Sequence, residues 1–245
     1  MTFIYPGSET YLSAFIESLN NQDTNDFDLL IFNDGMNNPE FYIGKYKRMY
    51  RIIDCCKSIV ENRLFALFYC KKHNYTSIIF GDSDDFFDRN RVSKINEKLK
   101  TIDIVVNDLT VVSKDGLTLI ENYFSQRLTN LQIIDYSDIE EKNFLGFSNT
   151  AINTNIFDDS FFEVKNVIAV DWYIFSVLLK NGATALFCNE TISYYRQHEN
   201  NIAGLDGKKS QEYIAQVRNK HFDALNLPPK SSFKKIESAN LFWWE

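Results

Sequence analysis

The stretch from Thr76 to Phe87 reads Thr-Ser-Ile-Ile-Phe-Gly-Asp-Ser-Asp-Asp-Phe-Phe. Its apolar run ends at Gly81 and is followed at once by Asp82, Asp84 and Asp85, as expected of a buried strand with carboxylates at its C-terminal end. Clustered acids repel one another unless a cation or hydrogen-bond donors compensate them, and oxygen ligands favour Mg²⁺ or Mn²⁺. On these residues alone, a solvated acidic turn that caps the next helix is the alternative.

Length and composition indicate one α/β domain with a trailing extension. The chain has 245 residues, 44% of them hydrophobic, and a net charge of −7. It offers no basic surface for a polyanion, so we expect no nucleic-acid partner, whereas a nucleotide could bind through a metal ion. Four cysteines, with Cys55 and Cys56 adjacent, and the lack of a leader predict a cytoplasmic protein with reduced thiols. No apolar run could span a bilayer, so any membrane contact would be peripheral, at the inner face.

The first third of the chain has an alternating pattern. Phe3 to Tyr5 is a predicted strand that stops at Pro6, and apolar residues spaced at i, i+3, i+4 and i+7 from Leu12 to Leu19 predict a helix. Phe27 to Phe32 is a second strand, which closes on Asn33-Asp34-Gly35. Short links between these elements imply parallel pairing with a right-handed crossover. Both loops then open on the sheet edge where ligands bind in open α/β folds.

The remaining elements predict a mixed sheet. An Asp-Gly pair at 115–116 lies between apolar runs and indicates a hairpin. Further predictions are helices at Ile52 to His73 and Arg91 to Lys100, strands at Asp103 to Asn107 and Thr184 to Cys188, a loop around Gly146, a helix from Tyr173 to Leu179 opened by Asp171-Trp172, and a charged helix from about Lys208 before a Phe-Trp-Trp tail.

Several motifs in order carry a family resemblance. They are the strand-Pro turn at Pro6, Ser-Leu-Asn-Asn-Gln at 18–22, Asn-Asp-Gly at 33–35, Glu-Asn-Arg at 61–63, Gly-Asp-Ser-Asp-Asp at 81–85, Val-Asp-Trp at 170–172 and Tyr-Arg-Gln-His at 195–198. Over residues 1–205 the chain resembles the family-2 glycosyltransferases of the GT-A fold. The resemblance implies a Rossmann-like, mixed but mainly parallel sheet flanked by helices. It divides the chain into a nucleotide-binding half at 1–108, an acceptor-binding half at 109–205 and a C-terminal helical extension at 206–245.

The resemblance assigns the nucleotide and donor to the side chains of Pro6, Asp34, Asn62, Arg63, Asp82 and Ser83. Asp34 would accept a hydrogen bond from the base. Asn33 replaces the Asp that usually precedes it, and Met36 stands where the family often has Ser, so the base stays open. The alternatives are a plain turn at 33–35 and a surface salt bridge for Arg63.

The resemblance also implies metal ligands and a loop around the donor sugar and acceptor. Asp84 and His198 would hold Mn²⁺ or Mg²⁺, which bridges the donor diphosphate and stabilises the leaving group. A structural His198 is the alternative. The donor and acceptor loop would comprise Gly146, Ser148, Asn149 and Trp172. The alternatives are an ordinary turn for the loop and a core position for Trp172.

Asp171 matches the family's general base, although the preceding residue is Val170 rather than an acid. It would take the proton from the acceptor hydroxyl as that oxygen attacks the anomeric carbon, and a single displacement inverts that centre. An N-cap role for Asp171 is the alternative.

The sequence therefore predicts an inverting, metal-dependent glycosyltransferase. Its donor would be a nucleotide-diphosphate sugar, with UDP favoured, and its acceptor a saccharide or a lipid-linked molecule in the synthesis of cell-surface polysaccharide or glycoconjugate. Two other classes stay open: a Mg²⁺-dependent phosphatase of the haloacid-dehalogenase type, in which the first Asp is the nucleophile, and a catalytically silent nucleotide-sugar-binding domain. The sequence predicts no oligomeric state.

Overall fold

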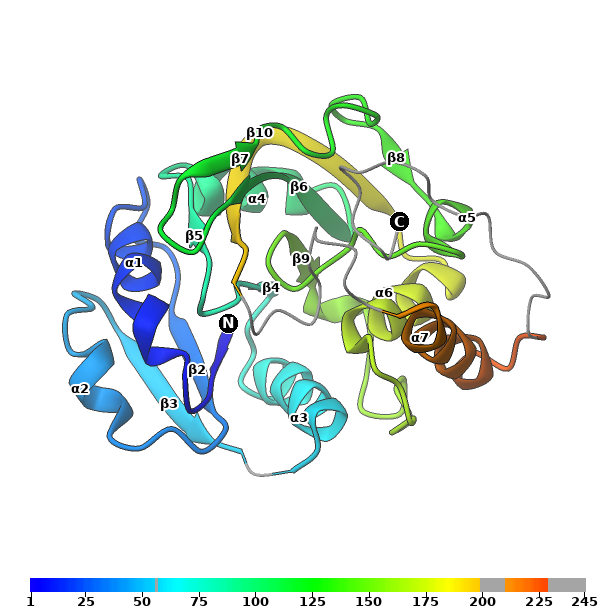
Figure 1. Cartoon of the computed structure of the whole chain (residues 1–245), viewed down its shortest axis with the longest axis horizontal. Helices are drawn as coiled ribbons and strands as arrows, with labels where there is room; N and C mark the ends of the chain where they lie inside the picture. The colour runs from blue at the N-terminus through cyan, green and yellow to red at the C-terminus, as the bar shows by residue number, and fades with distance from the viewer. Residues whose placement is uncertain (56, 199–209, 229–245) are drawn as a thin grey trace.

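The computed structural model describes residues 1–55, 57–198 and 210–228. Strands form a curved sheet through the middle of the molecule, and helices lie along it (Figure 1). The predicted mixed α/β sheet flanked by helices is confirmed.

The N-terminal half of the sheet is parallel. Strand β1 (Thr2–Ile4) pairs with β2 (Leu29–Asn33), and β2 pairs with β3 (Tyr50–Asp54), both in parallel. The amino group of Met1 donates to the Ile79 carbonyl at 2.8 Å, and the Gly81 N–H donates to the Met1 carbonyl at 3.1 Å. These two bonds place the start of β1 beside β4 (Ser77–Ile79), and so link the three-stranded sheet β1-β2-β3 to the seven-stranded sheet that begins with β4.

The second half of the sheet is mostly antiparallel. Its order continues from β4 through β9 (Thr150–Asn153), β6 (Ile104–Val112) and β10 (Ala185–Arg196) to β5 (Phe86–Phe87), with β7 (Thr118–Ile120) on β6 and β8 (Ile133–Ile134) on β10. Only β6 and β10 run parallel within this half of the described chain. Parallel pairing therefore dominates the first eighty or so residues, and the hairpins after β4 supply the antiparallel part.

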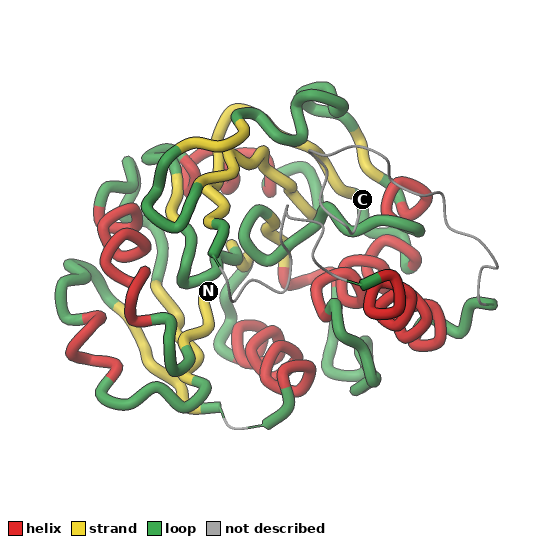
Figure 2. The backbone as a smooth tube through the Cα atoms, viewed as in Figure 1, coloured by secondary structure: helices red, strands yellow, loops and turns green. Residues whose placement is uncertain are grey.

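Helices cover both faces of the sheet (Figure 2). The helical elements are α1 (Glu9–Asn20), α2 (Pro39–Ile43), α3 (Ile59–Lys72), α4 (Arg91–Leu99), α5 (Tyr136–Ile139), the 3₁₀ turn η1 (Thr154–Ile156), α6 (Val170–Lys180) and α7 (Gln211–Ala224). The main core contains Phe32, Leu67, Phe80 and Phe175, so it joins the sheet to α3 and α6. A second core packs the apolar face of α1 on β1 and β2, as its spacing predicts.

One predicted helix is wrong. Residues 52–54, at the start of the helix expected from Ile52 to His73, belong to β3 (Tyr50–Asp54) instead, and α3 begins only at Ile59. The β-branched pair at Ile52-Ile53 fits a strand beside β2. Ser58 then starts α3 with a capping box, because its hydroxyl accepts from the Glu61 N–H and the Glu61 carboxylate accepts from the Ser58 N–H.

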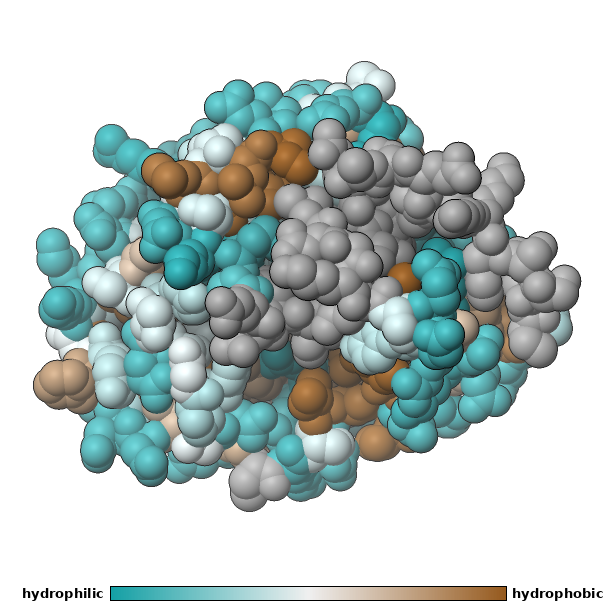
Figure 3. Space-filling model, in the orientation of Figure 1, coloured by the Kyte–Doolittle hydropathy of each residue, from teal (hydrophilic) through white to brown (hydrophobic). Residues whose placement is uncertain are grey.

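The last helix of the described residues is α7, which packs against α6 in Figure 1. The predicted boundary at residue 205 and the Phe-Trp-Trp tail lie outside the described residues. In the part of the chain that the structure describes, no helix has both the length and the apolar character needed to cross a bilayer. Most of the face in Figure 3 is hydrophilic, with apolar side chains gathered near β7 and below α6.

Candidate functional site

The site is built around Asp82–Asp85, here called the acidic loop, which follows β4 at the C-terminal edge of the parallel strands. The Asp85 N–H donates to the Asp82 carbonyl at 3.1 Å and closes the loop into a turn. The end of β10 crosses this loop, since the Arg196 guanidinium donates to the Asp84 carbonyl at 2.8 Å. Residues more than a hundred positions apart therefore meet here.

Asp84 and His198, the predicted metal ligands, are in direct contact. Nε2 of His198 lies 2.8 Å from Oδ2 of Asp84, and both side chains are largely buried. The Tyr11 ring stacks on the imidazole with 4.9 Å between ring centroids. This stacking restrains the orientation of the His198 ring.

Asp85 braces the acidic loop rather than facing a ligand. Its carboxylate is buried and accepts hydrogen bonds from the Arg196 N–H at 2.7 Å and from the Ser148 hydroxyl. Burial, and then the charge of Asp84, raise the pKa of Asp85 well above its ordinary value. Asp85 thus ties together the acidic loop, β10 and the loop at residues 146–149.

A second buried group, Arg91 at the start of α4, supports the loop from behind. Its guanidinium donates to the carbonyls of Phe80 at 2.8 Å and Ser148 at 3.0 Å and to the Asn107 side chain at 3.0 Å. Burial lowers the pKa of Arg91 to about 9, although the charges of Asp85 and Asp82 act to raise it. Sequence reasoning missed Arg91, and the one signal was the polar group Asn107-Asp108 within the mostly apolar strand β6.

Arg63 lies in the middle of the site. Its guanidinium sits 3.4 Å from the centroid of the Phe3 ring, and the charges of Asp82, Asp171 and Asp34 act on it, in that order among these three acids. Burial is the largest effect and lowers the pKa of Arg63. The surface salt-bridge alternative is therefore wrong. Among the described residues, the guanidinium has no hydrogen-bond partner, so its donors are available to a ligand.

Asp82 is the acid whose charge acts most strongly on Arg63. Burial, and then the charge of Asp84, raise its pKa to about 7, while Arg63 opposes the shift. The neighbouring Ser83 hydroxyl is buried with no hydrogen-bond partner in the described part of the chain. Buried polar atoms are rarely left unpaired, so this hydroxyl favours a ligand at the loop.

Asp171 also reaches this site from the first turn of α6. Its carboxylate accepts the Trp172 N–H at 2.8 Å and a hydrogen bond from Asn143. Burial raises the pKa of Asp171, and these hydrogen bonds oppose the shift. A Cβ added to Gly146 would lie 3.8 Å from Asp171 Oδ2, so the 146–149 loop is beside it. The helix begins at Val170, and thus Asp171 is not the N-cap.

Other predicted residues have structural surroundings. The Asn62 amide bonds both to the N–H and to the carbonyl of Lys57, and the Asn149 amide holds the Gly146 loop. Trp172 is buried, and its indole N–H donates to the Ile139 carbonyl at 2.7 Å.

Trp172 therefore takes the core alternative and does not face the Asp171 carboxylate. Its ring stacks on His221 of α7 at 3.7 Å between centroids. Pro6 is exposed at the end of β1, and Asp34 donates its N–H to the Ile4 carbonyl at 2.8 Å, beside that turn.

The donor set at the acidic loop fits a hard divalent cation. Within the residues described, no group of three or more His, Cys, Asp or Glu side chains is arranged to hold a metal. Mg²⁺ sites commonly use one or two carboxylates, with waters and substrate phosphates as the other ligands. The contact between Asp84 and His198 offers one carboxylate and one imidazole, which Mn²⁺ also accepts.

Comparison with solved structures identifies the fold. The chain is similar to S. aureus TarS in complex with UDP-GlcNAc, with a TM-score of 0.66, 16% identity and coverage of 91% of this chain and 66% of that one. It is also similar to S. aureus TarS with UDP, with a TM-score of 0.60, 15% identity and coverage of 91% and 65%.

A third solved structure of this fold is GalNAc-T7 with UDP, GalNAc and Mn²⁺, with a TM-score of 0.56, 10% identity and coverage of 89% and 46%. The chain has the GT-A fold and spans two thirds or less of the length of these proteins. No protein-family model and no curated protein matches the sequence. A GT-A fold gives no support to the haloacid-dehalogenase alternative.

Proposed function

We propose that this chain, which has the GT-A fold, is an inverting, metal-dependent glycosyltransferase of the family-2 type. It transfers a sugar from a UDP-sugar to a saccharide or lipid-linked acceptor in the synthesis of cell-surface polysaccharide or glycoconjugate. One observation carries the proposal: five separate segments bring Asp34, Arg63, Asp84, Asp171 and His198 to one edge of the sheet. If Asp84 belonged only to a solvated acidic turn, there would be no reason for Asp34, Arg63, Asp171 and His198 to gather near it.

The donor is held by its charge and by its base. Arg63 offers unpaired guanidinium donors, which suit the negative oxygens of a diphosphate or the hydroxyls of a ribose. Asp34 accepts from the base, and Asp82 and Ser83 lie next to the ribose and diphosphate. UDP is favoured because TarS in complex with UDP-GlcNAc and GalNAc-T7 with UDP are solved structures of the same fold.

Mn²⁺ or Mg²⁺ would be held by Asp84 and His198. When bound, the ion supplies Lewis-acid stabilisation of the charge that develops on the leaving diphosphate. The braced loop fixes these two side chains before the donor arrives, because Asp85 and Arg91 have buried, satisfied hydrogen bonds.

Asp171 acts on the acceptor. Its carboxylate removes the proton from the acceptor hydroxyl while that oxygen forms a bond to the anomeric carbon, and the bond from that carbon to the diphosphate breaks on the opposite face. The raised pKa makes Asp171 a stronger base than an exposed carboxylate. Asn143 and the Trp172 N–H hold the carboxylate in place. We place the reaction in the cytoplasm, at the inner face of the membrane when the acceptor is lipid-linked.

Release of the nucleoside diphosphate tests the proposal. The chain is incubated with UDP-glucose, UDP-galactose, UDP-GlcNAc or UDP-GalNAc, with and without Mn²⁺, and free UDP is measured. We expect Mn²⁺-dependent UDP release from at least one donor, and loss of that release in Asp84→Asn. Saturable donor binding without any release, with or without saccharide acceptors, would instead support the catalytically silent alternative.

A further inference from the structure

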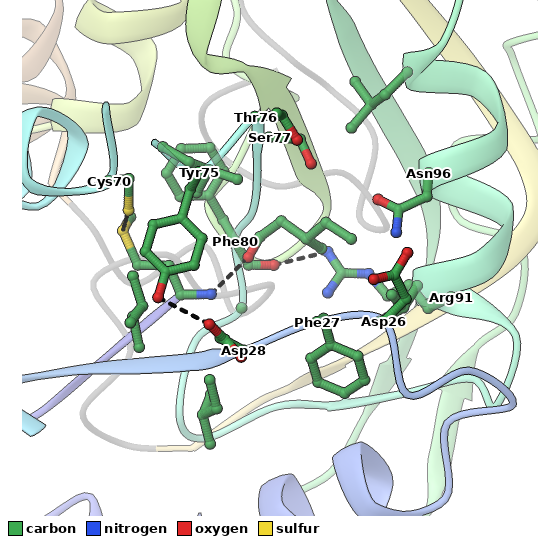
Figure 4. A pocket seen from close by; sticks show the side chains of 18 of the residues that line it. Asp26, Phe27, Asp28, Cys70, Tyr75, Thr76, Ser77, Phe80, Arg91 and Asn96 are labelled. Carbon is green, nitrogen blue, oxygen red and sulfur yellow. Dashed lines mark hydrogen bonds between the residues drawn. The ribbon is translucent and has the colours of Figure 1, made fainter. Parts of the chain in front are cut away.

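A pocket lies beside the N-terminal ends of β2 and β4 and extends along β4 as far as Gly81, which directly precedes the acidic loop. It has a volume of about 680 Å³, within the range of small-molecule sites. Tyr75 and Ser77 at the start of β4 line it, as do Asp28 and Leu29 at the start of β2. Since β2 and β4 run in the same direction, Asp34 and the acidic loop are at their opposite ends. Figure 4 shows this pocket from close by.

We propose that this pocket binds a neutral saccharide. It is formed where α1 and α4 leave part of one sheet face uncovered, and its lining combines aromatic surface with unpaired amide, carboxylate and hydroxyl groups. The proposal goes beyond glycosyl transfer and does not depend on the donor site.

The apolar part of the lining includes aromatic rings. Phe15 and Leu19 of α1 contribute to it, and Phe27 comes from the loop before β2. The Arg48 guanidinium covers one face of the Phe27 ring at 4.9 Å from its centroid. That contact restrains the ring, which suits it to pack against the C–H face of a sugar. Ile79 is only partly buried, although it belongs to a central strand.

The polar part of the lining forms two opposed groups. In Figure 4, Tyr75 and Asp28 lie on one side, joined by a hydrogen bond of 3.0 Å, and Asp26 and Asn96 lie on the other. Within the described residues, the side chains of Asp26 and Asn96 have no hydrogen-bond partner. A carboxylate accepts from hydroxyls, and an amide both accepts and donates, which matches the mixed donors and acceptors of a sugar.

Charge gives no preference for an anion such as phosphate or a nucleotide. Asp26 and Asp28 line the pocket and offset the two cations Lys100 and Arg91, so the lining has no excess of positive charge. At the inner end, the Arg91 guanidinium is already engaged by Phe80, Asn107 and Ser148. The polar side chains along the pocket also disfavour a purely apolar chain, because its entry would leave them unpaired.

Saturation-transfer NMR with glucose, galactose, GlcNAc and GalNAc tests the proposal on the full chain. We expect transfer to at least one sugar in the presence of saturating UDP and Mn²⁺. Phe27→Ala and Asn96→Ala should each weaken that sugar's affinity at least about tenfold. Glu97→Ala, on the same helix but exposed and outside the pocket, should leave it unchanged. Thermal unfolding confirms that each variant is folded.

Three results would overturn the proposal. One is the lack of transfer to every sugar, and another is transfer that both pocket variants retain in full. The third is that only spermidine or inorganic phosphate shows a dependence on Asn96, since the ligand class is then wrong. Because the donor site is tested by Asp84→Asn and UDP release, failure here leaves the proposed function standing, and a transfer signal displaced by UDP belongs to the donor site.

Discussion

Asp171 is the residue on which the mechanism depends. It lies in the first turn of α6, where the helix dipole and the Trp172 N–H favour its charge, yet burial is the larger effect and raises its pKa. A base with a raised pKa that is held by Asn143 and placed beside Gly146 is suited to take a proton from a hydroxyl. Its neighbour Trp172 points into the core, so it does not share this role.

Asp171→Asn should lower turnover by roughly 10² or more, because it removes a positioned base. Donor affinity should stay within a few-fold, since the base acts only when the acceptor is present. We expect the free energy of unfolding to change by no more than about 1 kcal/mol, because a buried carboxylate is replaced by an amide of the same shape. Steady-state transfer kinetics and calorimetry with the donor measure these quantities. Wild-type turnover in this variant would contradict the mechanism.

The pH profile gives a separate test of Asp171. Its pKa is raised, so the carboxyl is protonated and inactive over a wider acidic range than an ordinary Asp. We expect kcat/KM to fall as pH drops through this raised pKa and to be highest above it. An acid limb at the position of an unperturbed Asp would show that another group acts as the base.

His198→Ala tests the metal assignment. The imidazole contacts Asp84, so its removal should weaken Mn²⁺ affinity while leaving metal-free binding of the nucleoside nearly intact. Calorimetric titration with Mn²⁺ in the presence of UDP measures the effect. Tyr11→Phe, which keeps the ring that stacks on His198, should bind Mn²⁺ as wild type does. If His198→Ala binds Mn²⁺ with wild-type affinity, His198 is not a metal ligand and its role is structural.

The sequence could predict individual side chains when a local motif marked them. Asp84, Asp171 and His198 each occur in a short pattern, and the structure brings them to one edge of the sheet. Asp85 and Arg91 could not be assigned this way, because their roles depend on partners from Phe80 to Arg196. No local sequence pattern predicts that Asp85 is buried beneath the end of β10, because that strand is more than a hundred residues away.

At the scale of elements, Asp85 connects the acidic loop to β10 and to the 146–149 loop. Asp85→Ala should lower the free energy of unfolding by about 2–4 kcal/mol, because the Arg196 N–H and the Ser148 hydroxyl lose their acceptor. Mn²⁺ affinity should also fall, since Arg196 precedes His198 by two residues. Chemical denaturation and Mn²⁺ titration measure the two effects.

Asp88→Ala is a matched control for this brace. Asp88 also accepts two hydrogen bonds from β10, from the Ile192 N–H and the Tyr194 hydroxyl, each at 3.0 Å, but it lies outside the acidic loop. Asp88→Ala should lower the free energy of unfolding by a similar amount to Asp85→Ala, but it should leave Mn²⁺ affinity unchanged. Equal loss of Mn²⁺ affinity in the two variants would mean that Asp85 has no specific positioning role.

The docking of α7 on α6 depends on a buried, neutral histidine. His221 stacks on Trp172, and neither ring nitrogen has a hydrogen-bond partner among the described residues. Burial, and then the charge of Lys180, lower its pKa from 6.5 to about 3. The unfolded chain therefore binds the proton between these values, and stability is lost as pH falls below 6.5.

His221→Phe should remove this pH dependence while keeping the ring on Trp172. At pH 5 the wild-type histidine costs about 2 kcal/mol relative to pH 8, by linkage with an unfolded pKa near 6.5. Denaturant unfolding at both pH values measures the difference. The control variant His73→Gln, at an exposed histidine after α3, should keep the wild-type difference in stability between the two pH values. The same pH dependence in His221→Phe would mean that other groups cause it.

At the scale of the whole molecule, some elements could be predicted from the sequence and others depend on tertiary pairing. The first two strands, α1 and the acidic loop follow from periodicity and turn residues, so much of the fold of the first hundred or so residues is predictable. β3 was missed because its short run at Ile52-Ile53 resembles the beginning of the next helix, and only pairing with β2 settles it. The pocket lined by α1 and α4 could not be predicted from the sequence, because it depends on how these helices pack against the sheet.

We propose that the acidic loop binds a nucleotide-diphosphate sugar through a divalent metal. A thermal-shift panel of UDP-, GDP-, dTDP- and CMP-sugars, with and without Mn²⁺, tests it on the wild type and Asp84→Asn. We expect UDP-sugars with Mn²⁺ to stabilise the wild type, by about 2.7 kcal/mol at a hundred times the dissociation constant, and Asp84→Asn to abolish the Mn²⁺-dependent part. Absence of Mn²⁺-dependent stabilisation by every nucleotide sugar, or an undiminished effect in Asp84→Asn, would contradict the account.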